Sequence, residues 1–259
     1  MGQRSIRERT GPPSRKEIMV IVASRELRDG DVVVVGLGLP QVAAMLAQRT
    51  HAPNLHMVLE IGVIDPQPVD PAVGIADPRI WYRASSFCGF VDTLGTLLPK
   101  GAVDVGFLGG LEVDKYGNIN SSLTLEAPGK SRHFTGSGGA NDIASMANRT
   151  IIMMPQQKRK FPERVTFVTC PGYEGGSGKR WGLKGGGPWR VITDMAVFGF
   201  SDGQMELLSV HPGVTVEDVL AEMQFTPKMP ERVPVTSVGS AEELRLIREV
   251  IDPDGLYTA

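Results

Sequence analysis

The sequence has few cysteines, no long apolar run and almost no net charge. Its 259 residues include two cysteines, Cys88 and Cys170, too few for the disulfide framework of a small secreted protein, so reduced thiols are expected. The 27 Lys and Arg residues nearly balance the 29 Asp and Glu residues, and a net charge of −2 gives no support for a nucleic-acid partner. No stretch approaches the roughly 18 apolar residues of a membrane span. We therefore expect a cytoplasmic protein that acts neither on nucleic acid nor in a membrane.

Metal and nucleotide motifs are missing as well. The four histidines show neither metal-ligand spacing nor a partnering cysteine pair, so no metal site is expected. The run Gly36-Leu37-Gly38 lacks the third glycine of a dinucleotide fingerprint, because position 41 is Gln41. The run 175–179 has the look of a phosphate loop, but Tyr173 occupies the place of its first glycine. The absence of these motifs argues against the common classes of nucleotide-binding enzyme.

Glycine and proline, by contrast, are abundant, with 31 and 19 copies. Many tight turns and close approaches of the backbone are therefore expected. The length suits one large α/β domain or two small ones, and neither a linker nor an internal repeat divides the chain. We expect a mobile polar tail over residues 1–13, followed by a single domain over residues 14–259.

The order of the elements predicts an open, mostly parallel sheet flanked by helices. Ser14 and Glu17 form a capping box at the start of a helix that Gly30 ends, and Pro40 suits the first turn of a second helix. The segments 32–35 and 55–60 have the continuous apolar pattern of strands buried on both faces. A strand, a helix and a second strand in this order predict a right-handed crossover between parallel strands.

The rest of the chain continues this pattern and adds a small antiparallel unit near its C-terminal third. Further regular elements are predicted as a helix at 91–98, strands at 103–108, 151–154 and 165–169, and a helix after 136–141. The segments 191–194, 197–200 and 204–208 are expected to form the antiparallel unit. Thr215 and Ser240 cap two C-terminal helices. The predicted fold class is thus α/β.

Glu60 is the most informative single residue. It closes the apolar strand 55–60, and Gly62 follows two positions later. A carboxylate at the carboxyl end of a parallel strand lies where open α/β sheets bind their ligands, and a nearby glycine lets the backbone approach a bound group closely. A strand-end glutamate is more often a surface or ion-paired residue, and an unpaired one reduces stability unless it takes part in chemistry. The neighbouring loops favour a catalytic role.

Three glycine-containing loops come directly after predicted strands. They are Gly36-Leu37-Gly38, Glu60-Ile61-Gly62 and Gly109-Gly110. In a parallel sheet all three meet at the carboxyl edge, where they offer one carboxylate and several unhindered backbone N–H groups. This combination suits a nucleophile beside an oxyanion site. A fourth loop, from Gly136 to Asn141, opens a helix whose N–H groups could hold a polar or anionic ligand, although each glycine alone could simply serve a tight turn.

Taken in order, these loops resemble the β subunit of a class I CoA-transferase, of the glutaconate CoA-transferase type. The resemblance covers nearly the whole chain, from about residue 14 to residue 252. It rests on the runs 35–40, 58–62, 108–118, 135–141, 151–154 and 247–253. The element formed by Glu60 and Gly62 is a weak sign of the family by itself, whereas the order of the glycine-rich loops is specific to the family.

The resemblance implies that Glu60 is a nucleophile that carries CoA as a glutamyl thioester between an acyl-CoA and a free carboxylic acid. CoA is then a substrate, and no cofactor is bound permanently. The partner would be a CoA-transferase α subunit, in a heterodimer that assembles into a heterotetramer or larger. The oxyanion and acyl site would be lined by Gly36, Gly38, Gly62, Gly109 and Gly110, and the CoA chain would lie near Gly136, Ser137, Gly138, Gly139 and Asn141.

The sequence leaves two other functions open. Chains that resemble this family also act as acyl-CoA hydrolases or decarboxylases, or as non-catalytic CoA-binding regulatory subunits. The presence of Glu60 favours CoA transfer, because a pure binding module has no need of a costly carboxylate at this position. Ile61 stands where many relatives are expected to have a small residue, so the sequence does not define the acyl group.

Overall fold

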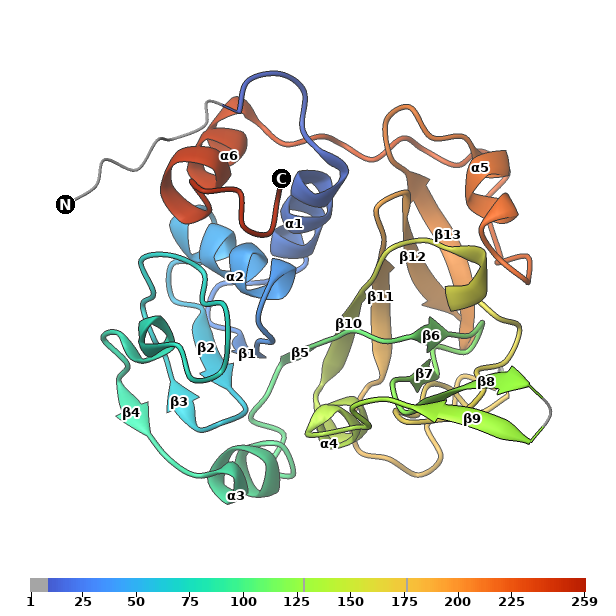
Figure 1. Ribbon diagram of the computed structural model, residues 1–259, viewed down its shortest axis with the longest axis horizontal. Helices are drawn as coiled ribbons and strands as arrows, with labels where there is room; N and C mark the ends of the chain where they lie inside the picture. Colours follow the sequence, from blue (N-terminus) through green and yellow to red (C-terminus); the bar gives the residue numbers. More distant parts are fainter. Residues whose placement is uncertain (1–8, 128, 176) are drawn as a thin grey trace.

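The computed structural model describes residues 9–127, 129–175 and 177–259 (Figure 1). Residues 1–8, most of the expected tail, lie outside this part. The guanidinium of Arg9 donates a hydrogen bond to Thr258 Oγ1 over 2.6 Å, so the described chain meets its own C-terminal segment before the first helix begins. The domain boundary expected at residue 14 stays a prediction.

A nine-stranded sheet forms the centre of the described chain, in the order β13-β12-β11-β10-β5-β1-β2-β3-β4. Its parallel strands are β1 (Val32–Val34), β2 (His56–Leu59), β5 (Val105–Leu108), β10 (Arg149–Met153) and β11 (Pro188–Ile192). Antiparallel strands extend the two edges: β12 (Ala196–Ser201) and β13 (Gln204–Val210), and β3 (Val63–Ile64) and β4 (Ser86–Phe87). The predicted fold class and its C-terminal antiparallel addition are confirmed. The second antiparallel edge was not predicted.

The parallel strands are apolar at consecutive positions because both faces of the sheet are buried. Val33 and Val35 belong to one hydrophobic cluster, together with α1 (Arg15–Arg25) and α2 (Leu39–Arg49). Val34, which points to the opposite face, belongs to a second cluster. A strand covered on both faces has no polar position to alternate with, which explains the unbroken valine run.

The predicted caps set the starts of the first two helices. Ser14 Oγ accepts the Glu17 N–H over 3.1 Å at the start of α1, and proline stands in the first turn of α2. The expected end of the first helix near Gly30 is wrong. α1 ends at Arg25, and the backbone then turns so that the Arg28 N–H donates to the Asp31 carboxylate over 2.9 Å.

Shorter helices surround the sheet. The helix predicted at 91–98 is α3 (Phe90–Asp92), continued by a π-helical turn over Thr93–Leu97. The others are α4 (Ala140–Met146), α5 (Val216–Ala221), α6 (Ala241–Arg245) with a π-helical turn over Leu246–Ile251, and 3-10 helices over Pro78–Trp81 and Lys158–Lys160. In Figure 1, α6 lies beside α1 and α2. No helix of the described chain is long and apolar enough to cross a membrane.

Two hairpins outside the main sheet were not predicted. They are β6–β7 (Glu112–Val113 and Ile119–Asn120) and β8–β9 (Leu123–Ala127 and Lys130–His133). The strand expected at 165–169 is wrong. The N–H groups of Val165 and Thr166 donate to the carboxylates of Asp114 (3.4 Å) and Glu112 (2.7 Å). Because side chains accept these backbone donors, the segment forms no strand, and only its end bonds to β7, where the Thr169 N–H donates to the Ile119 carbonyl over 2.9 Å.

A buried ion pair ties the first helix to the C-terminal helical segment. Glu17 is almost fully buried, and its two carboxylate oxygens accept hydrogen bonds from Arg248, each over 2.7 Å. Burial by itself raises the pKa of Glu17, but hydrogen bonds from Arg248 and the Ser14 N–H, with the charges of Arg248 and Arg9, bring this pKa below its ordinary value of 4.5. The charged form of Glu17 therefore depends on Arg248.

Arg248→Met should destabilise the fold by about 3–5 kcal/mol at neutral pH, because it leaves the buried charge of Glu17 without its main partner. Arg245→Met is the matched control on the same helical segment. Arg245 pairs with Glu242 and Glu249 at the surface, so its loss should leave the unfolding midpoint nearly unchanged. Urea unfolding measures both variants.

The cost of Arg248→Met should also depend on pH. A glutamate whose pKa is lowered by folding stabilises the fold above the unfolded pKa of about 4.5, and this contribution is lost as the pH falls through the folded pKa. The difference between the wild type and Arg248→Met should therefore shrink below about pH 4.5. Equal effects of the two arginine substitutions at neutral pH would contradict a special role for this pair.

Candidate active site

Glu60 lies in a tight turn between β2 and β3, at the carboxyl end of the parallel strands. The Gly62 N–H donates a hydrogen bond to the Leu59 carbonyl over 2.9 Å, which closes the turn, and Gly62 has a φ of 98°. A Cβ atom at Gly62 would lie 1.8 Å from the Cys88 carbonyl oxygen, so the turn requires glycine. The expected place of Glu60 at a strand end is confirmed. The hairpin that reverses the chain there was not predicted.

Two hydrogen bonds hold the backbone of this turn. The hydroxyl of Thr93, which is buried, donates to the Glu60 carbonyl over 2.9 Å. The Cys88 N–H donates to the Gly62 carbonyl over 2.8 Å. Sequence reasoning missed Thr93, since a hydroxyl that bonds a residue 33 positions away leaves no local pattern.

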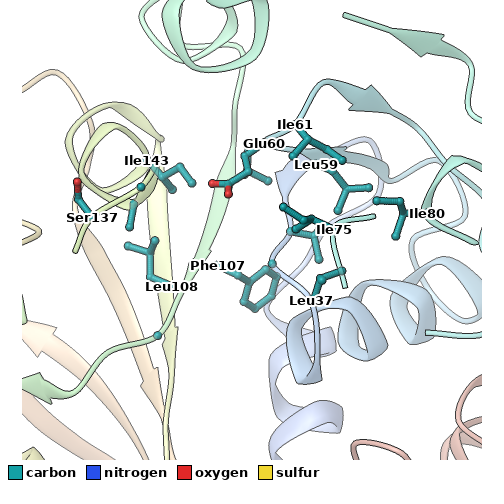
Figure 2. Close-up of a pocket in the computed structure, with 17 residues that line it drawn as sticks. Leu37, Leu59, Glu60, Ile61, Ile75, Ile80, Phe107, Leu108, Ser137 and Ile143 are labelled. Carbon is teal, nitrogen blue, oxygen red and sulfur yellow. The ribbon is translucent and has the colours of Figure 1, made fainter. Parts of the chain in front are cut away.

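The Glu60 side chain points into a cavity of about 230 Å³ (Figure 2). Within the described chain, Glu60 is the one charged residue of the lining, and Ser137 supplies its one side-chain hydroxyl. The remaining side chains are apolar: Val34, Val35, Leu37, Leu59, Ile61, Ile75, Ile80, Phe107, Leu108, Ala140 and Ile143. The cavity therefore presents one carboxylate in apolar surroundings.

The cavity lies where the chain changes direction across the sheet. From β1 the chain first adds β2 on one side and later returns to add β5 and β10 on the other. The loops after β1 and β5, which contain Gly36 and Gly109, both line the cavity. Open α/β sheets bind ligands at such a switch point, because the loops there diverge and leave a crevice.

The Glu60 carboxylate has no partner among residues 9–127, 129–175 and 177–259. The one hydrogen bond to Glu60 from another side chain is that of Thr93, and it goes to the backbone carbonyl. A half-buried carboxylate without a donor or a cation is costly to keep in an apolar site. Its oxygens can also reach a substrate without first breaking a hydrogen bond to another residue of the described chain.

The predicted site residues divide into two groups. Gly36, Gly109, Ser137, Gly138 and Gly139 line the cavity together with Glu60. The others lie outside the lining and serve the packing around it. Gly38 begins α2 beneath Tyr257, Gly62 closes the turn, Gly110 packs against Ile119, the Gly136 N–H donates to Ser121, and the Asn141 side chain donates to Thr169.

Gly139 lies close to the Glu60 carboxylate. A Cβ atom there would lie 2.9 Å from Glu60 Oε2 and 2.8 Å from Leu94 Cδ1. A side chain at this position would have to displace both the carboxylate and the end of the leucine. Gly139 therefore makes room for Glu60, a role that the sequence could suggest only through the glycine-rich run.

The apolar wall formed by Ile75 and Ile80 was not predicted, because these residues come from an irregular segment without periodicity. The segment is fixed at Ala72, whose N–H donates to Gln41 Oε1 over 3.0 Å. The Ala72 carbonyl accepts the Tyr257 hydroxyl over 2.5 Å. The C-terminal segment thus supports one wall of the cavity through contacts that are distant in sequence.

Neither thiol offers a competing nucleophile. Burial, with the nearby charge of Asp92, raises the pKa of Cys88. Burial also raises the pKa of Cys170 to about 12. Both thiols are therefore neutral near pH 7, and neither lines the cavity. Within the described chain no group of three or more His, Cys, Asp or Glu residues could hold a metal ion.

Comparison with known proteins gives a consistent result. The family model described as "Coenzyme A transferase" matches residues 16–222. The chain is 36% identical to the B subunit of glutaconate CoA-transferase from Acidaminococcus fermentans, with 93% of both chains covered. It is 34% identical to the B subunit of 3-oxoadipate CoA-transferase from Pseudomonas knackmussii, with 91% of this chain and 92% of the relative covered.

Solved structures show the same likeness. The crystal structure of glutaconate coenzyme A-transferase from Acidaminococcus fermentans superimposes with a TM-score of 0.87 at 33% identity, covering 95% of this chain and 97% of that one. The decarboxylase AibA/AibB superimposes with a TM-score of 0.82 at 26% identity, covering 95% and 98%. The fold is therefore shared by a CoA-transferase and by an enzyme with another activity.

Gly62→Ala should be much more destabilising than Gly101→Ala. Both glycines have a positive φ, 98° and 72°, so alanine strains the backbone at either site by roughly 1–2 kcal/mol. A Cβ atom at Gly101 meets nothing within 4 Å, whereas at Gly62 it collides with the Cys88 carbonyl. We expect Gly62→Ala to cost at least about 2 kcal/mol more in urea unfolding. Equal costs would show that the Cys88 carbonyl does not confine the turn.

Proposed function

The chain belongs to the coenzyme A transferase family, and we propose that it is the β subunit of a two-chain enzyme that moves CoA from an acyl-CoA to a free carboxylic acid. The main support from the site is the carboxylate of Glu60, which has no partner among the residues that the structure describes and lies in an apolar cavity at the strand ends. A carboxylate suits this reaction, because its anhydride and its thioester are both activated. CoA can therefore be passed on without losing the energy of the thioester bond.

In the first half of the proposed reaction, Glu60 accepts CoA from the donor. A Glu60 carboxylate oxygen attacks the thioester carbonyl carbon, and the C–S bond breaks. The CoA thiolate departs, and the acyl group is then joined to Glu60 in a mixed anhydride. The thiolate then attacks the Glu60 carbonyl carbon of the anhydride. The donor's acyl group departs as a free carboxylate, and Glu60 holds CoA as a thioester.

The second half repeats these steps in reverse order. The acceptor carboxylate attacks the glutamyl thioester, which releases the CoA thiolate and forms a second anhydride. The thiolate then attacks the acyl carbon of the acceptor, which yields the new acyl-CoA and restores the Glu60 carboxylate. No oxidant, reductant or net proton transfer is required, so a single carboxylate can serve as the covalent catalyst.

The glycines around Glu60 support this chemistry. Gly36 and Gly109 follow two strands, and Gly138 and Gly139 precede α4, so the backbone of three loops borders the carboxylate. Backbone N–H groups without a side chain in front of them can donate to the oxyanion that forms at each attack. The apolar walls keep water away from the anhydride, which would otherwise hydrolyse.

The small volume of the cavity supports the proposal that a second chain contributes to the site. Its volume of about 230 Å³ lies below the roughly 300–1,000 Å³ of pockets that enclose a drug-sized ligand, and an acyl-CoA is larger still. This chain can therefore hold the reacting carbonyl but not the whole substrate. We expect an α subunit to supply the remaining wall, with a heterodimer as the smallest active unit.

Incubation of the assembled enzyme with an acyl-CoA, without an acceptor acid, should leave CoA on Glu60 as a thioester. Borohydride then reduces the modified side chain to an alcohol, which peptide mass spectrometry assigns to position 60. Glu60→Gln keeps the size of the side chain but removes the nucleophilic oxygen. This variant should not be labelled, and its transfer rate should fall by at least about 10⁴-fold.

Two outcomes would count against the proposed function. Full turnover with an unmodified Glu60 would rule out the covalent route. Release of free CoA at the same rate with and without an acceptor acid would identify a hydrolase instead, because a transferase needs the acceptor to complete its cycle.

Gly139→Ala should lower kcat/KM by roughly 10²-fold, since its Cβ must displace the Glu60 carboxylate and a misplacement of about 1 Å can cost that much. The control is Gly95→Ala, next to Leu94, where a Cβ atom makes an ordinary contact of 3.6 Å with Val91. Thermal unfolding of both variants checks that the fold is intact. Unchanged kcat/KM in Gly139→Ala would show that Glu60 does not react from the position seen here.

A further inference from the structure

The Glu60 cavity has two unlike sides. Figure 2 shows Ile75 and Ile80 on one side of the carboxylate, and Ser137 and Ile143 on the other. The second side belongs to the glycine-rich run that leads into α4, along which the resemblance to CoA-transferases places CoA. The first side, the apolar wall, is therefore left for the acyl group.

The apolar wall is part of a packed cluster. Ile80 is fully buried in a cluster that includes Leu59, and Leu37 and Ile61 pack against this cluster. Ile75 also lines the cavity but is 62% exposed, so it lies where the cavity meets the solvent. All five side chains are aliphatic, and an aliphatic surface binds a group that loses little by leaving water.

No cation lines this cavity within residues 9–127, 129–175 and 177–259. Arg79, which precedes Ile80 in the chain, stays outside the lining and pairs with Asp77 over 2.5 Å. A second carboxylate on the acyl group would thus enter apolar surroundings that already hold the charge of Glu60. A charge without a counter-ion is costly there, and a like charge nearby adds to the cost.

The proposed chemistry fixes the position of the acyl group. In the mixed anhydride, the acyl carbonyl carbon is bonded to an oxygen of Glu60. The carbons next to it must therefore lie inside the cavity, whatever the α subunit adds outside. The side chains of this chain thus act on the acyl group at the step in which it is transferred.

We infer that the enzyme prefers apolar acyl groups that carry no second carboxylate, and that Ile75 helps to determine this specificity. The inference rests on the proposed function and extends it, because it names the class of acyl group. The apolar wall attracts an aliphatic chain, and Glu60, without a cation beside it in the described lining, repels a diacid. Specificity commonly combines attraction and rejection in this way.

The test uses the complex of the full-length chain with the CoA-transferase α chain of the same source organism. It measures the rate at which an acyl-CoA converts Glu60 to its CoA thioester without an acceptor acid, so that only one acyl group takes part. Pentanoyl-CoA is compared with glutaryl-CoA, and hexanoyl-CoA with adipoyl-CoA. The acyl groups of each pair have equal numbers of carbons and differ in the terminal carboxylate.

The readout is the specificity ratio, the rate constant for the monoacid divided by that for the diacid. In the wild type this ratio should be at least about 10². Ile75→Arg should lower the ratio by at least about 10-fold, because a guanidinium can pair with the second carboxylate. Ile75→Asp should raise the ratio, because like charges repel. A contact between the new guanidinium and Glu60 would slow both acyl-CoAs alike and would cancel in the ratio.

Val73→Arg is the matched control. Val73 is as exposed as Ile75 (61% against 62%) and lies on the same segment, but it does not line the cavity. This variant should keep a ratio close to that of the wild type. Thermal unfolding checks the fold of each variant, and Ile75→Asp decides the question if Ile75→Arg does not fold.

A wild-type ratio of one or less would overturn the inference and leave the proposed function standing. Equal ratios in the wild type and both Ile75 variants would show that Ile75 does not face the acyl group. No thioester from any of the four acyl-CoAs would refute the proposed function instead. Their dissociation constants, measured by calorimetry on the same complex, would then show whether the cavity prefers the apolar acyl groups.

Discussion

The turn at residues 59–62 is confined from two sides, and the site depends on that constraint. The Glu60 carboxylate has no side-chain partner within the described chain, so it is placed by its own backbone. That backbone is fixed because Gly62 packs against the Cys88 carbonyl and the Thr93 hydroxyl bonds to the Glu60 carbonyl. A rigid support beneath a side chain without a partner in the described chain keeps the carboxylate positioned without an ion pair that would compete for its charge.

The sheet explains why this turn meets glycine-rich backbone. Parallel strands covered on both faces leave their carboxyl ends as the exposed edge, and all the loops that follow them gather there. The loop after β1, the turn after β2 and the loop after β5 thus share one cavity although they are far apart in sequence. The start of α4 closes the opposite side in Figure 2, where Ser137 and Ile143 face Glu60. The fold brings the parts together, and the residues at the loop ends determine what they do.

Local sequence patterns predicted the parts of this structure that are formed locally. The capping box at Ser14, the helix caps at Thr215 and Ser240, the valine run of β1 and the strand that leads to Glu60 all depend on neighbouring residues. Thr93, the apolar wall at Ile75 and the irregular course of 165–169 depend on contacts with distant residues. Amino-acid types alone did not reveal the roles of Thr93 and Ile75, and for 165–169 they wrongly predicted a strand.

The glycines show the same limit within the site itself. Gly36, Gly109 and Gly139 leave space in the cavity, while Gly38, Gly62 and Gly110 allow close packing or a tight turn outside its lining. Both needs select the residue without a side chain, so a glycine in the sequence does not reveal which need it meets. The distinction required the positions of Tyr257, Cys88 and Ile119, which approach from other parts of the chain.

The close approach of residue 139 to the Glu60 carboxylate links two positions in the history of this protein. While residue 60 is glutamate, the 2.9 Å gap to a Cβ atom at position 139 disfavours every side chain there, although the neighbouring Leu94 could move aside. In a descendant with a shorter residue at position 60, alanine or serine at position 139 would have only the end of the Leu94 side chain to displace. The two positions are therefore coupled, because a glutamate restored at position 60 would have to shift its carboxylate away from a side chain at position 139.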